Sequence, residues 1–316
     1  MEAPAPSCAP HLIARQSVLS IYRDFTVALL SGLFVLLVLL SAYLGWSATS
    51  TVNAIYADAI VFLQNSGQPV PPNPVFDTSP LSLLRNMSIY VSLIGALAAI
   101  VVGYQLIAAD RKSGVLPLLG TRPFDRTAYA RGKITALVMV LSLLMAVTGL
   151  ISIGTILLLP QFAPGVLGWL KLFAFFALSF AYMLLFGLLA MATAAWSKSE
   201  SVGLLLPVTV WLTVTFIMPS ITGNILPTAA INPVSALAPP PDTPFFNWSG
   251  ALVGPLSLAE SFKYLSAELL DFLPAGTMLR SVVPPLPDLV IAICAAWFLA
   301  VRAMLRMDMT RGDYNA

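Results

Sequence analysis

Residues 110–133 read DRKSGVLPLLGTRPFDRTAYARGK, and this stretch decides how the chain is organised. An uncharged apolar run ends just before it at Ala109, and another begins just after it at Ile134. Two apolar runs joined by a short cationic segment are typical of two membrane helices and the loop between them. The stretch holds six cations in a chain that is only 9% charged: Arg111, Lys112, Arg122, Arg126, Arg131 and Lys133.

The composition places the chain in the membrane. It has 316 residues, of which 58% are hydrophobic, and its mean hydropathy is +0.88. Because a soluble domain carries about 25% charged residues, most of this surface must face lipid. A nucleic-acid-binding protein would need a basic face, whereas these cations sit beside apolar runs. Cys8 lies in the N-terminal tail and Cys294 in the last apolar run, so they should lie on different sides of the membrane or at different depths, and we expect no disulfide. His11 is the only histidine and no pair has metal-ligand spacing, so we expect no metal site.

We expect an all-α integral membrane protein with six transmembrane helices, since about 20 apolar residues cross a bilayer in a helix. The first run follows 24 residues of tail and is too long for the apolar core of a cleaved signal peptide, so we expect it to be retained. The predicted spans are Phe25–Trp46, Met87–Ala109, Ile134–Leu159, Val166–Trp196, Val202–Thr222 and Pro285–Leu305.

The distribution of Lys and Arg predicts that both termini are cytoplasmic. This orientation places twelve cations inside and four outside, the four being Arg85, Lys171, Lys263 and Arg280. The expected organisation is a cytoplasmic tail and interfacial helix (1–24), a six-helix transmembrane domain (25–305) with a large external loop (223–284), and a cytoplasmic tail (306–316).

Two further helices are expected outside the spans. Residues 11–24 predict an interfacial helix before the first span. Residues 256–273, LSLAESFKYLSAELLDFL, have helical apolar periodicity and predict an external amphipathic helix. That helix either packs on the outer ends of the spans or acts as a lid on a substrate path. Its apolar face consists of Leu258, Phe262, Leu265, Leu269 and Phe272.

Catalytic motifs are missing from the sequence. It has no G-x-S-x-G or H-E-x-x-H motif and no ionisable residue in the centre of an apolar run, so we expect neither an enzyme nor a proton-coupled carrier. Gly132-Lys133 is not a P-loop, because that motif would need Gly at 127 and Ser or Thr at 134; the chain has Thr127 and Ile134. If ATP drives this protein, another chain binds it.

The stretch 110–133 is arranged as an apolar patch between two charged shoulders. Gly114 is suited to end a helix, and Asp125 is suited to cap the next one. The Leu-rich patch is too short to span a membrane and suits docking of a soluble partner. The alternative is a positive-inside loop that only fixes topology. The docking residues we predict are Asp110, Arg111, Gly114, Leu116, Leu118, Leu119, Pro123, Asp125, Arg126, Gly132 and Lys133.

With these residues in view, the chain resembles the ABC-2 class of ABC transporter permeases. The shared pattern is an acid-Arg pair after the second span, then Gly, a Leu-rich run, Pro followed by a Ser/Asp-Arg pair, and Gly-Lys opening the third span. Asp110 and Asp125 replace the more usual Glu and Ser, and Pro117 interrupts the Leu-rich run. The chain length and INPVSAL (231–237) are most similar to the nitrous-oxide-reductase maturation and gliding-motility subgroup.

The resemblance implies a transport subunit of the inner (cytoplasmic) cell membrane. Such permeases work as homodimers or as pairs of related chains, and each binds one cytoplasmic ABC ATPase. The resemblance therefore implies that the partner holds ATP and Mg²⁺, that the loop after the second span transmits ATPase closure, and that the substrate is exported. The row Gly95, Ala99 and Gly103 permits close helix approach, either within one subunit or between two.

Two other functions stay open from the sequence. One is a non-transporting membrane anchor or assembly factor of a multi-protein complex. The other is a stand-alone carrier that transports without an ATPase. The apolar spans do not identify a substrate, because lipids, hydrophobic drugs and peptides would all be tolerated by such a lining.

Overall fold

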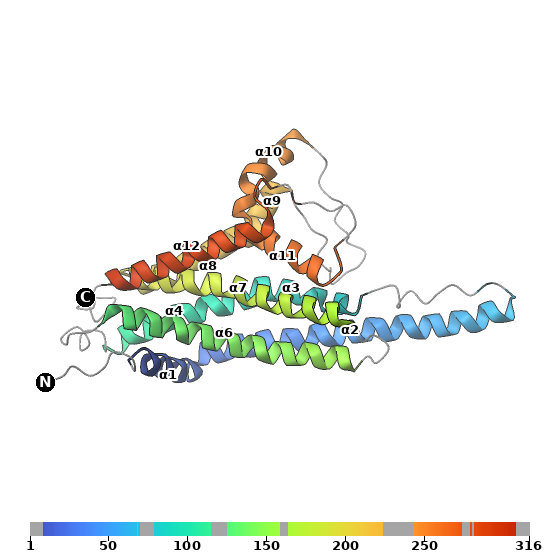
Figure 1. Ribbon diagram of the computed structural model, residues 1–316, viewed down its shortest axis with the longest axis horizontal. Coiled ribbons are helices and arrows are strands. Elements are labelled where there is room, and N and C mark those ends of the chain that lie inside the picture. Colours follow the sequence, from blue (N-terminus) through green and yellow to red (C-terminus); the bar gives the residue numbers. More distant parts are fainter. Residues whose placement is uncertain are drawn as a thin grey trace.

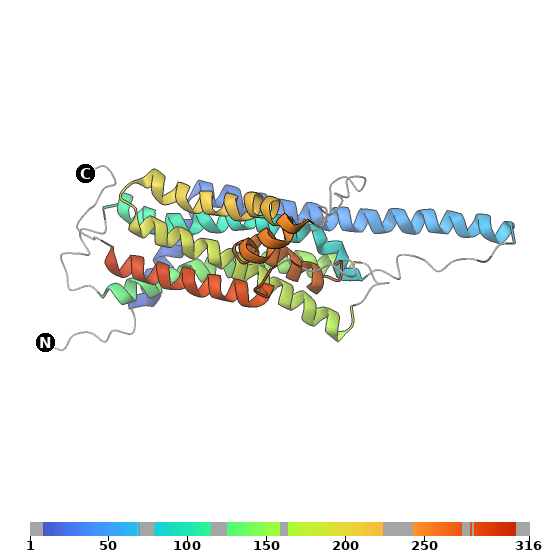
Figure 2. The ribbon, with the colours of Figure 1, turned by 90° about the horizontal axis from the view of Figure 1, so that it is seen from above.

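The computed structural model describes residues 9–67, 69, 79–114, 125–158, 164–223, 243–273, 279 and 281–307. These residues form a helical bundle (Figures 1 and 2) with no strand among them. Six helical segments of this part of the chain are long and apolar enough to cross a membrane, which confirms the predicted fold class. They are Phe25–Asn65, Pro80–Lys112, Arg126–Leu157, Val166–Trp196, Glu200–Thr222 and Pro285–Arg306.

Four of the six spans are uninterrupted helices, and two are divided by short non-α segments. The uninterrupted helices are α2 (Phe25–Asn65), α6 (Arg126–Leu157), α7 (Val166–Trp196) and α12 (Pro285–Arg306). The second span consists of η1 (Pro80–Leu84), α3 (Arg85–Tyr90), the π-helical η2 (Val91–Gly95) and α4 (Ala96–Lys112). The fifth consists of α8 (Glu200–Leu212), the π-helical η4 (Thr213–Ile217) and α9 (Met218–Thr222).

The first helix is much longer than predicted. We expected it to end at Trp46, but α2 continues to Asn65 and has 41 residues. At 1.5 Å per residue it is about 60 Å long, twice the hydrocarbon thickness of about 30 Å. No Gly or Pro follows Gly45 until Gly67, which has a φ of +66°. The more polar residues that follow Trp46 therefore did not end the helix, which continues until just before Gly67. Its second half extends beyond the bundle (Figures 1 and 2), and no side chain from Ser50 to Asn65 is buried.

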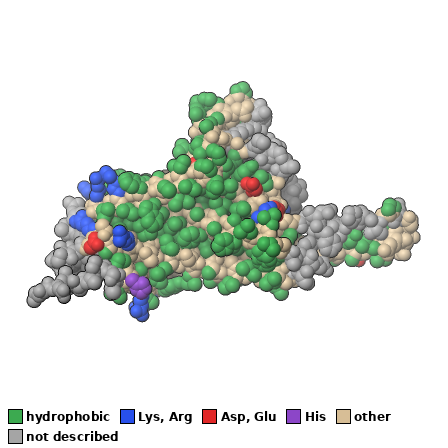
Figure 3. Space-filling view, viewed as in Figure 1, with side chains coloured by type: hydrophobic (Ala, Val, Ile, Leu, Met, Phe, Trp, Pro, Cys, Tyr) green, Lys and Arg blue, Asp and Glu red, His purple; other side chains and the backbone are tan. Residues whose placement is uncertain are grey.

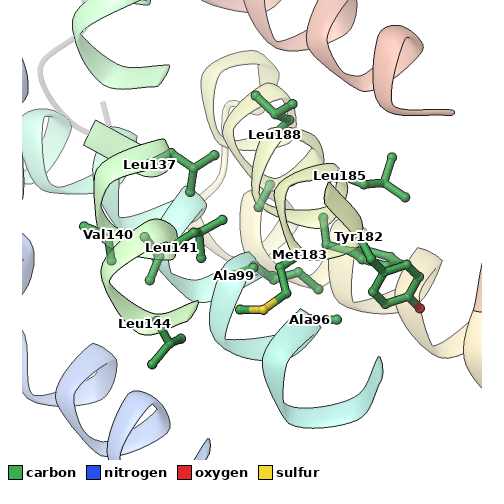
Figure 4. Close-up of a cluster of buried hydrophobic side chains, with 14 of the residues drawn as sticks. Ala96, Ala99, Leu137, Val140, Leu141, Leu144, Tyr182, Met183, Leu185 and Leu188 are labelled. Atoms are coloured by element: carbon green, nitrogen blue, oxygen red, sulfur yellow. The ribbon is translucent and has the colours of Figure 1, made fainter. Parts of the chain in front are cut away.

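The core lies where α4, α6 and α7 meet (Figure 4). Leu, Val and Ala side chains of these helices interdigitate there, and most of them are fully buried. Gly103 of α4 faces Gly187 of α7 so closely that a Cβ on Gly103 would lie 2.1 Å from the Gly187 carbonyl oxygen. The packing row Gly95, Ala99 and Gly103 is therefore used within one chain. A Cβ on Gly95 would also meet the side chains of Met183 and Phe34.

The described structure has three further α-helices and one short 3-10 helix outside the six spans. The predicted interfacial helix is α1 (Ala9–Tyr22), and it packs on the start of α6. The predicted amphipathic helix, residues 256–273, is α11 (Leu258–Leu269), which is shorter than predicted at both ends. It is preceded by α10 (Pro244–Val253) and η5 (Gly254–Leu256), which the sequence pattern did not indicate.

Charged side chains gather at one end of the bundle (Figure 3), which we call the charged end. It comprises α1, the ends of α4, α7 and α12, and the starts of α6 and α8. The described N-terminal helix and the end of α12 both lie there, as an even number of spans requires. Apolar side chains cover the middle of the bundle face in Figure 3, as expected of a surface in contact with lipid.

Candidate functional site

The predicted docking stretch lies at the charged end. Its first part ends α4, and its last part begins α6. The predicted docking residues Leu116, Leu118, Leu119 and Pro123 lie outside the described residues. The other predicted docking residues can be followed one by one: Asp110, Arg111, Gly114, Asp125, Arg126, Gly132 and Lys133.

Asp110 and Lys133 form an ion pair between α4 and α6. The Lys133 Nζ lies 2.7 Å from the Asp110 Oδ2, and the Lys133 side chain is only 3% exposed. The Tyr129 hydroxyl donates a hydrogen bond of 2.8 Å to the same carboxylate oxygen. The Lys133 Nζ also lies 5.4 Å from the centre of the Tyr129 ring. Burying an ammonium group is costly unless it is paired, so this contact fixes α4 to α6.

Arg111 joins α4 to the end of α7. Its Nη1 donates to the Ser197 carbonyl and its Nη2 to the Ala195 carbonyl, both at 2.7 Å. The last carbonyls of a helix have no partner within it and carry its negative dipole end. A forked guanidinium therefore satisfies two of them at once. The next residue, Lys112, forms an ion pair with Glu200 in the first turn of α8.

The start of α6 is fixed in a similar way. Asp125 has the predicted capping role, because its Oδ1 accepts hydrogen bonds from the Thr127 backbone N–H at 2.8 Å and from the Thr127 hydroxyl at 2.7 Å. Both hydrogen bonds lower the pKa of the Asp125 carboxyl, and the bond from the Thr127 hydroxyl has the larger effect. The Arg126 Nη1 donates to the Leu305 carbonyl at the end of α12, at 2.9 Å.

The two glycines among the predicted docking residues, Gly114 and Gly132, have structural roles. Gly114 follows the end of α4 with a φ of +65°, the left-handed conformation in which glycine commonly ends a helix. Gly132 lets α1 approach α6, because a Cβ there would lie 2.8 Å from the Ile13 side chain and 3.0 Å from the Pro10 carbonyl oxygen. The predicted interfacial helix is thereby packed onto the candidate site.

The charges of this stretch thus bind helix ends of their own chain. Asp110, Arg111 and Arg126 connect α4 with α6, α4 with α7, and α6 with α12. Sequence reasoning missed the partners Tyr129, Ser197 and Glu200. Tyr129 could have been found, since it lies four residues before Lys133 on the same helix face. The carbonyl partners on α7 had no sequence signal, because any residue supplies a carbonyl.

The second predicted region, α11, lies at the opposite end of the bundle and contacts α7, α12 and η4. Phe262 is fully buried, while Leu258, Leu265, Leu269 and Phe272 are partly buried against the core. Glu260 is not part of the predicted apolar face, yet it is only 3% exposed. Its carboxylate accepts a hydrogen bond from the Thr222 hydroxyl at 2.9 Å. Asp288, at the start of α12, accepts one of 2.8 Å from the Ser261 hydroxyl.

The described residues include no cluster of three or more His, Cys, Asp or Glu side chains that could hold a metal ion. At the charged end, the described side chains form ion pairs and hydrogen bonds between helix ends.

Comparison with known proteins identifies the family of this chain. The family model described as "ABC-2 family transporter protein" matches residues 12–273, which include most of α1, the stretch 110–133 and α11. No curated protein matches the chain significantly. The matched residues make up most of the chain, and six helices could cross a membrane. The chain belongs to the ABC-2 transporter family and is a multi-pass membrane permease component of an ABC transporter.

Proposed function

We propose that this permease binds its ATPase subunit at the charged end and that the linked helix ends there transmit ATP-driven movement to the bundle. The observation that carries the proposal is that the adjacent residues Asp110 and Arg111 connect the end of α4 to both α6 and α7. Force applied at the end of α4 would reach two other spans directly through these side-chain contacts.

The proposal assigns ATP and Mg²⁺ to the partner subunit. Lys133 is the cation of the Gly-Lys pair that superficially resembles a P-loop. Its ammonium group is buried against Asp110, so it is not available to a phosphate. The chain itself would carry out no catalysis, and it would contribute the path for the substrate.

Export through two paired permease chains is part of the same proposal. The cationic charged end supports a cytoplasmic location for it, by the positive-inside tendency. An ATPase there would drive alternating access between two bundles in the cytoplasmic membrane. Because Gly95, Ala99 and Gly103 pack against α7, that row does not supply the surface on which the two chains pair.

Charge reversal tests the proposal. The complex would be purified from membranes through a tag on the permease, and ATP hydrolysis would be measured for wild type, Arg111→Glu and Arg126→Glu. We expect both variants to lower hydrolysis at least severalfold, because a carboxylate would repel the helix carbonyls that each arginine binds. Arg131→Glu is the matched control, since Arg131 is exposed on the same helix as Arg126.

The outcomes separate the candidate functions. If both variants keep wild-type association and hydrolysis, the coupling role of the charged end is wrong. If an ATPase co-purifies but its hydrolysis does not depend on the permease or respond to any substrate, the chain is a membrane anchor instead. Transport by the purified chain alone in liposomes would identify a stand-alone carrier.

A further inference from the structure

The helices α7 and α11 lie side by side and run in opposite directions. Near one end, the Lys171 Nζ of α7 lies 2.5 Å from the Oδ1 of Asp271, just after α11. Further along, the Tyr182 ring of α7 stacks on the Phe262 ring of α11 with 4.4 Å between ring centres. These two contacts fix the register between α7 and α11 along the whole length of α11, the shorter helix.

This register brings two serines to the same level. Ser179 lies about one turn from Tyr182 toward Lys171, and Ser266 lies about one turn from Phe262 toward Asp271. The two serines therefore occupy the next layer beyond the stacked rings. In the layer after that, Phe175 and Leu270 are both fully buried and close the interface with apolar side chains.

Buried hydroxyl groups without an ordinary hydrogen bond concentrate in this interface. Six buried side-chain oxygens in the described part of the chain make no hydrogen bond of ordinary distance and angle, and two of them, the Tyr182 and Thr215 hydroxyls, lie close enough to interact with each other. Ser179 and Tyr182 belong to α7, Thr215 to η4, and Ser266 to α11; Ser257 directly precedes α11, and Ser41 lies elsewhere, on α2. We call Ser179, Tyr182, Thr215 and Ser266 the hydroxyl seam. Figure 4 shows the Tyr182 hydroxyl pointing away from the apolar cluster of α4, α6 and α7.

The backbone beside the seam is also unusual. Both π-helical segments, η2 and η4, contact α11. They are linked to each other, since Trp211 before η4 donates to the Ser92 carbonyl of η2 at 3.0 Å. π-Helical turns are rare and occur frequently at functional sites. Two of them beside one group of unpaired hydroxyls are an independent indication of a binding site.

The chemistry of the seam favours an uncharged ligand. Its own groups are neutral hydroxyls, which both donate and accept hydrogen bonds. The nearest buried carboxylates, Glu260 and Asp288, already accept hydrogen bonds from Thr222 and Ser261. An ion would have to lose its hydration without a counter-charge in the seam, whereas a neutral polar group would meet donors and acceptors.

We propose that the hydroxyl seam binds a neutral hydrogen-bonding group between α7 and α11. Internal water supplies that group in the isolated chain, or a hydroxyl or amide of the translocated substrate supplies it in the working transporter. The second source rests on the proposed function, and the first does not.

The sign of a stability change tests the proposal. Unpaired buried hydroxyls destabilise a fold, so deleting one that binds nothing raises the unfolding temperature, whereas deleting one that binds water lowers it. The full chain would be unfolded in detergent as wild type and as the variants Ser179→Ala and Ser266→Ala, because the Tyr182 and Thr215 hydroxyls can also interact with each other. Ser41→Ala is the matched control, because Ser41 is equally buried and lies outside the seam.

If water is bound in the seam, the seam variants should lower the unfolding temperature by about 2–4 °C, whereas Ser41→Ala should not lower it. If a group of the substrate occupies the seam instead, the seam variants should leave the unfolding temperature unchanged or raise it. They should then lower ATP hydrolysis by the co-purified complex severalfold. Seam variants that behave like Ser41→Ala in both measurements overturn the proposal. If no ATPase co-purifies, the proposed function fails, and the unfolding temperature alone decides this proposal.

Discussion

At the scale of single residues, the charges of the stretch 110–133 serve the fold before they can serve a partner. Lys133 illustrates this, because a nearly fully buried ammonium is tolerated only with Asp110 and Tyr129 beside it. The acid-Arg pattern by which the sequence resembles ABC-2 permeases is, in this chain, a set of helix-to-helix contacts.

The buried ion pair predicts strong coupling between its two members. Lys133→Met leaves the Asp110 carboxylate with Tyr129 alone, and Asp110→Asn leaves the ammonium without a counter-charge. We expect each change to destabilise the protein by about 3–5 kcal/mol, as is usual when one partner of a buried pair is removed. The double variant should be more stable than the sum of the two losses predicts. Thermal unfolding in detergent checks this, and additive losses would contradict it.

The Asp125 cap predicts a dependence on pH. Hydrogen bonds from Thr127 lower the pKa of Asp125 in the folded protein, so its ionised form stabilises the fold above the unfolded pKa. That stabilisation is lost as the pH falls through the lower, folded pKa. The unfolding temperature of wild type relative to Asp125→Asn should therefore decrease below about pH 4. A constant difference between pH 6 and pH 3 would show that the cap does not titrate.

At the scale of helices, the contact between α4 and α7 depends on the absence of side chains. A Cβ on Gly103 would overlap the Gly187 carbonyl. Gly103→Ala should therefore force the helices apart and cost about 1–3 kcal/mol. Gly32→Ala is the matched control, because a Cβ at Gly32 of α2 meets nothing within 4 Å and should be neutral or stabilising. Equal unfolding temperatures for the two variants would contradict the packing described here.

Helix positions were predictable from the sequence wherever apolar length decided them. Val166–Trp196 was predicted at its observed bounds, and the fifth and sixth spans were predicted within two residues. The extension of α2 was not predicted, because apolar length indicates where a helix crosses lipid and says little about where it stops in water. Its continuation depends on helix-forming residues and on the distance to Gly67.

The candidate site was predictable only in part. The residues of the stretch, the Asp125 cap and the helix-ending role of Gly114 were recognisable in the sequence. The intrachain partners of Arg111 and Arg126 were not, because they are backbone carbonyls of helices far away in the sequence. The burial of Glu260 was also missed, since helical periodicity describes one apolar face and α11 is enclosed on several sides.

At the scale of the whole molecule, the two ends of the bundle should lie on opposite sides of the membrane. The charged end should be cytoplasmic, and the projecting half of α2 should be outside. Single cysteines at Ser20 and Ile55, in a chain with Cys8 and Cys294 replaced, would report this. An impermeant thiol reagent added to intact cells should label Ile55→Cys, and it should label Ser20→Cys only after permeabilisation. The reverse pattern would invert the proposed orientation.

The central claim is that a separate ATPase binds and drives this permease at the charged end. A photoreactive amino acid placed at Ser113, exposed where α4 ends, tests it most directly when compared with one at Ser50 on α2. Illumination of membranes should cross-link Ser113 to an ATP-binding protein, with a yield that changes when ATP is bound, and should give no such product from Ser50. A cross-link to an ATP-binding protein from Ser50 and none from Ser113 would contradict the account.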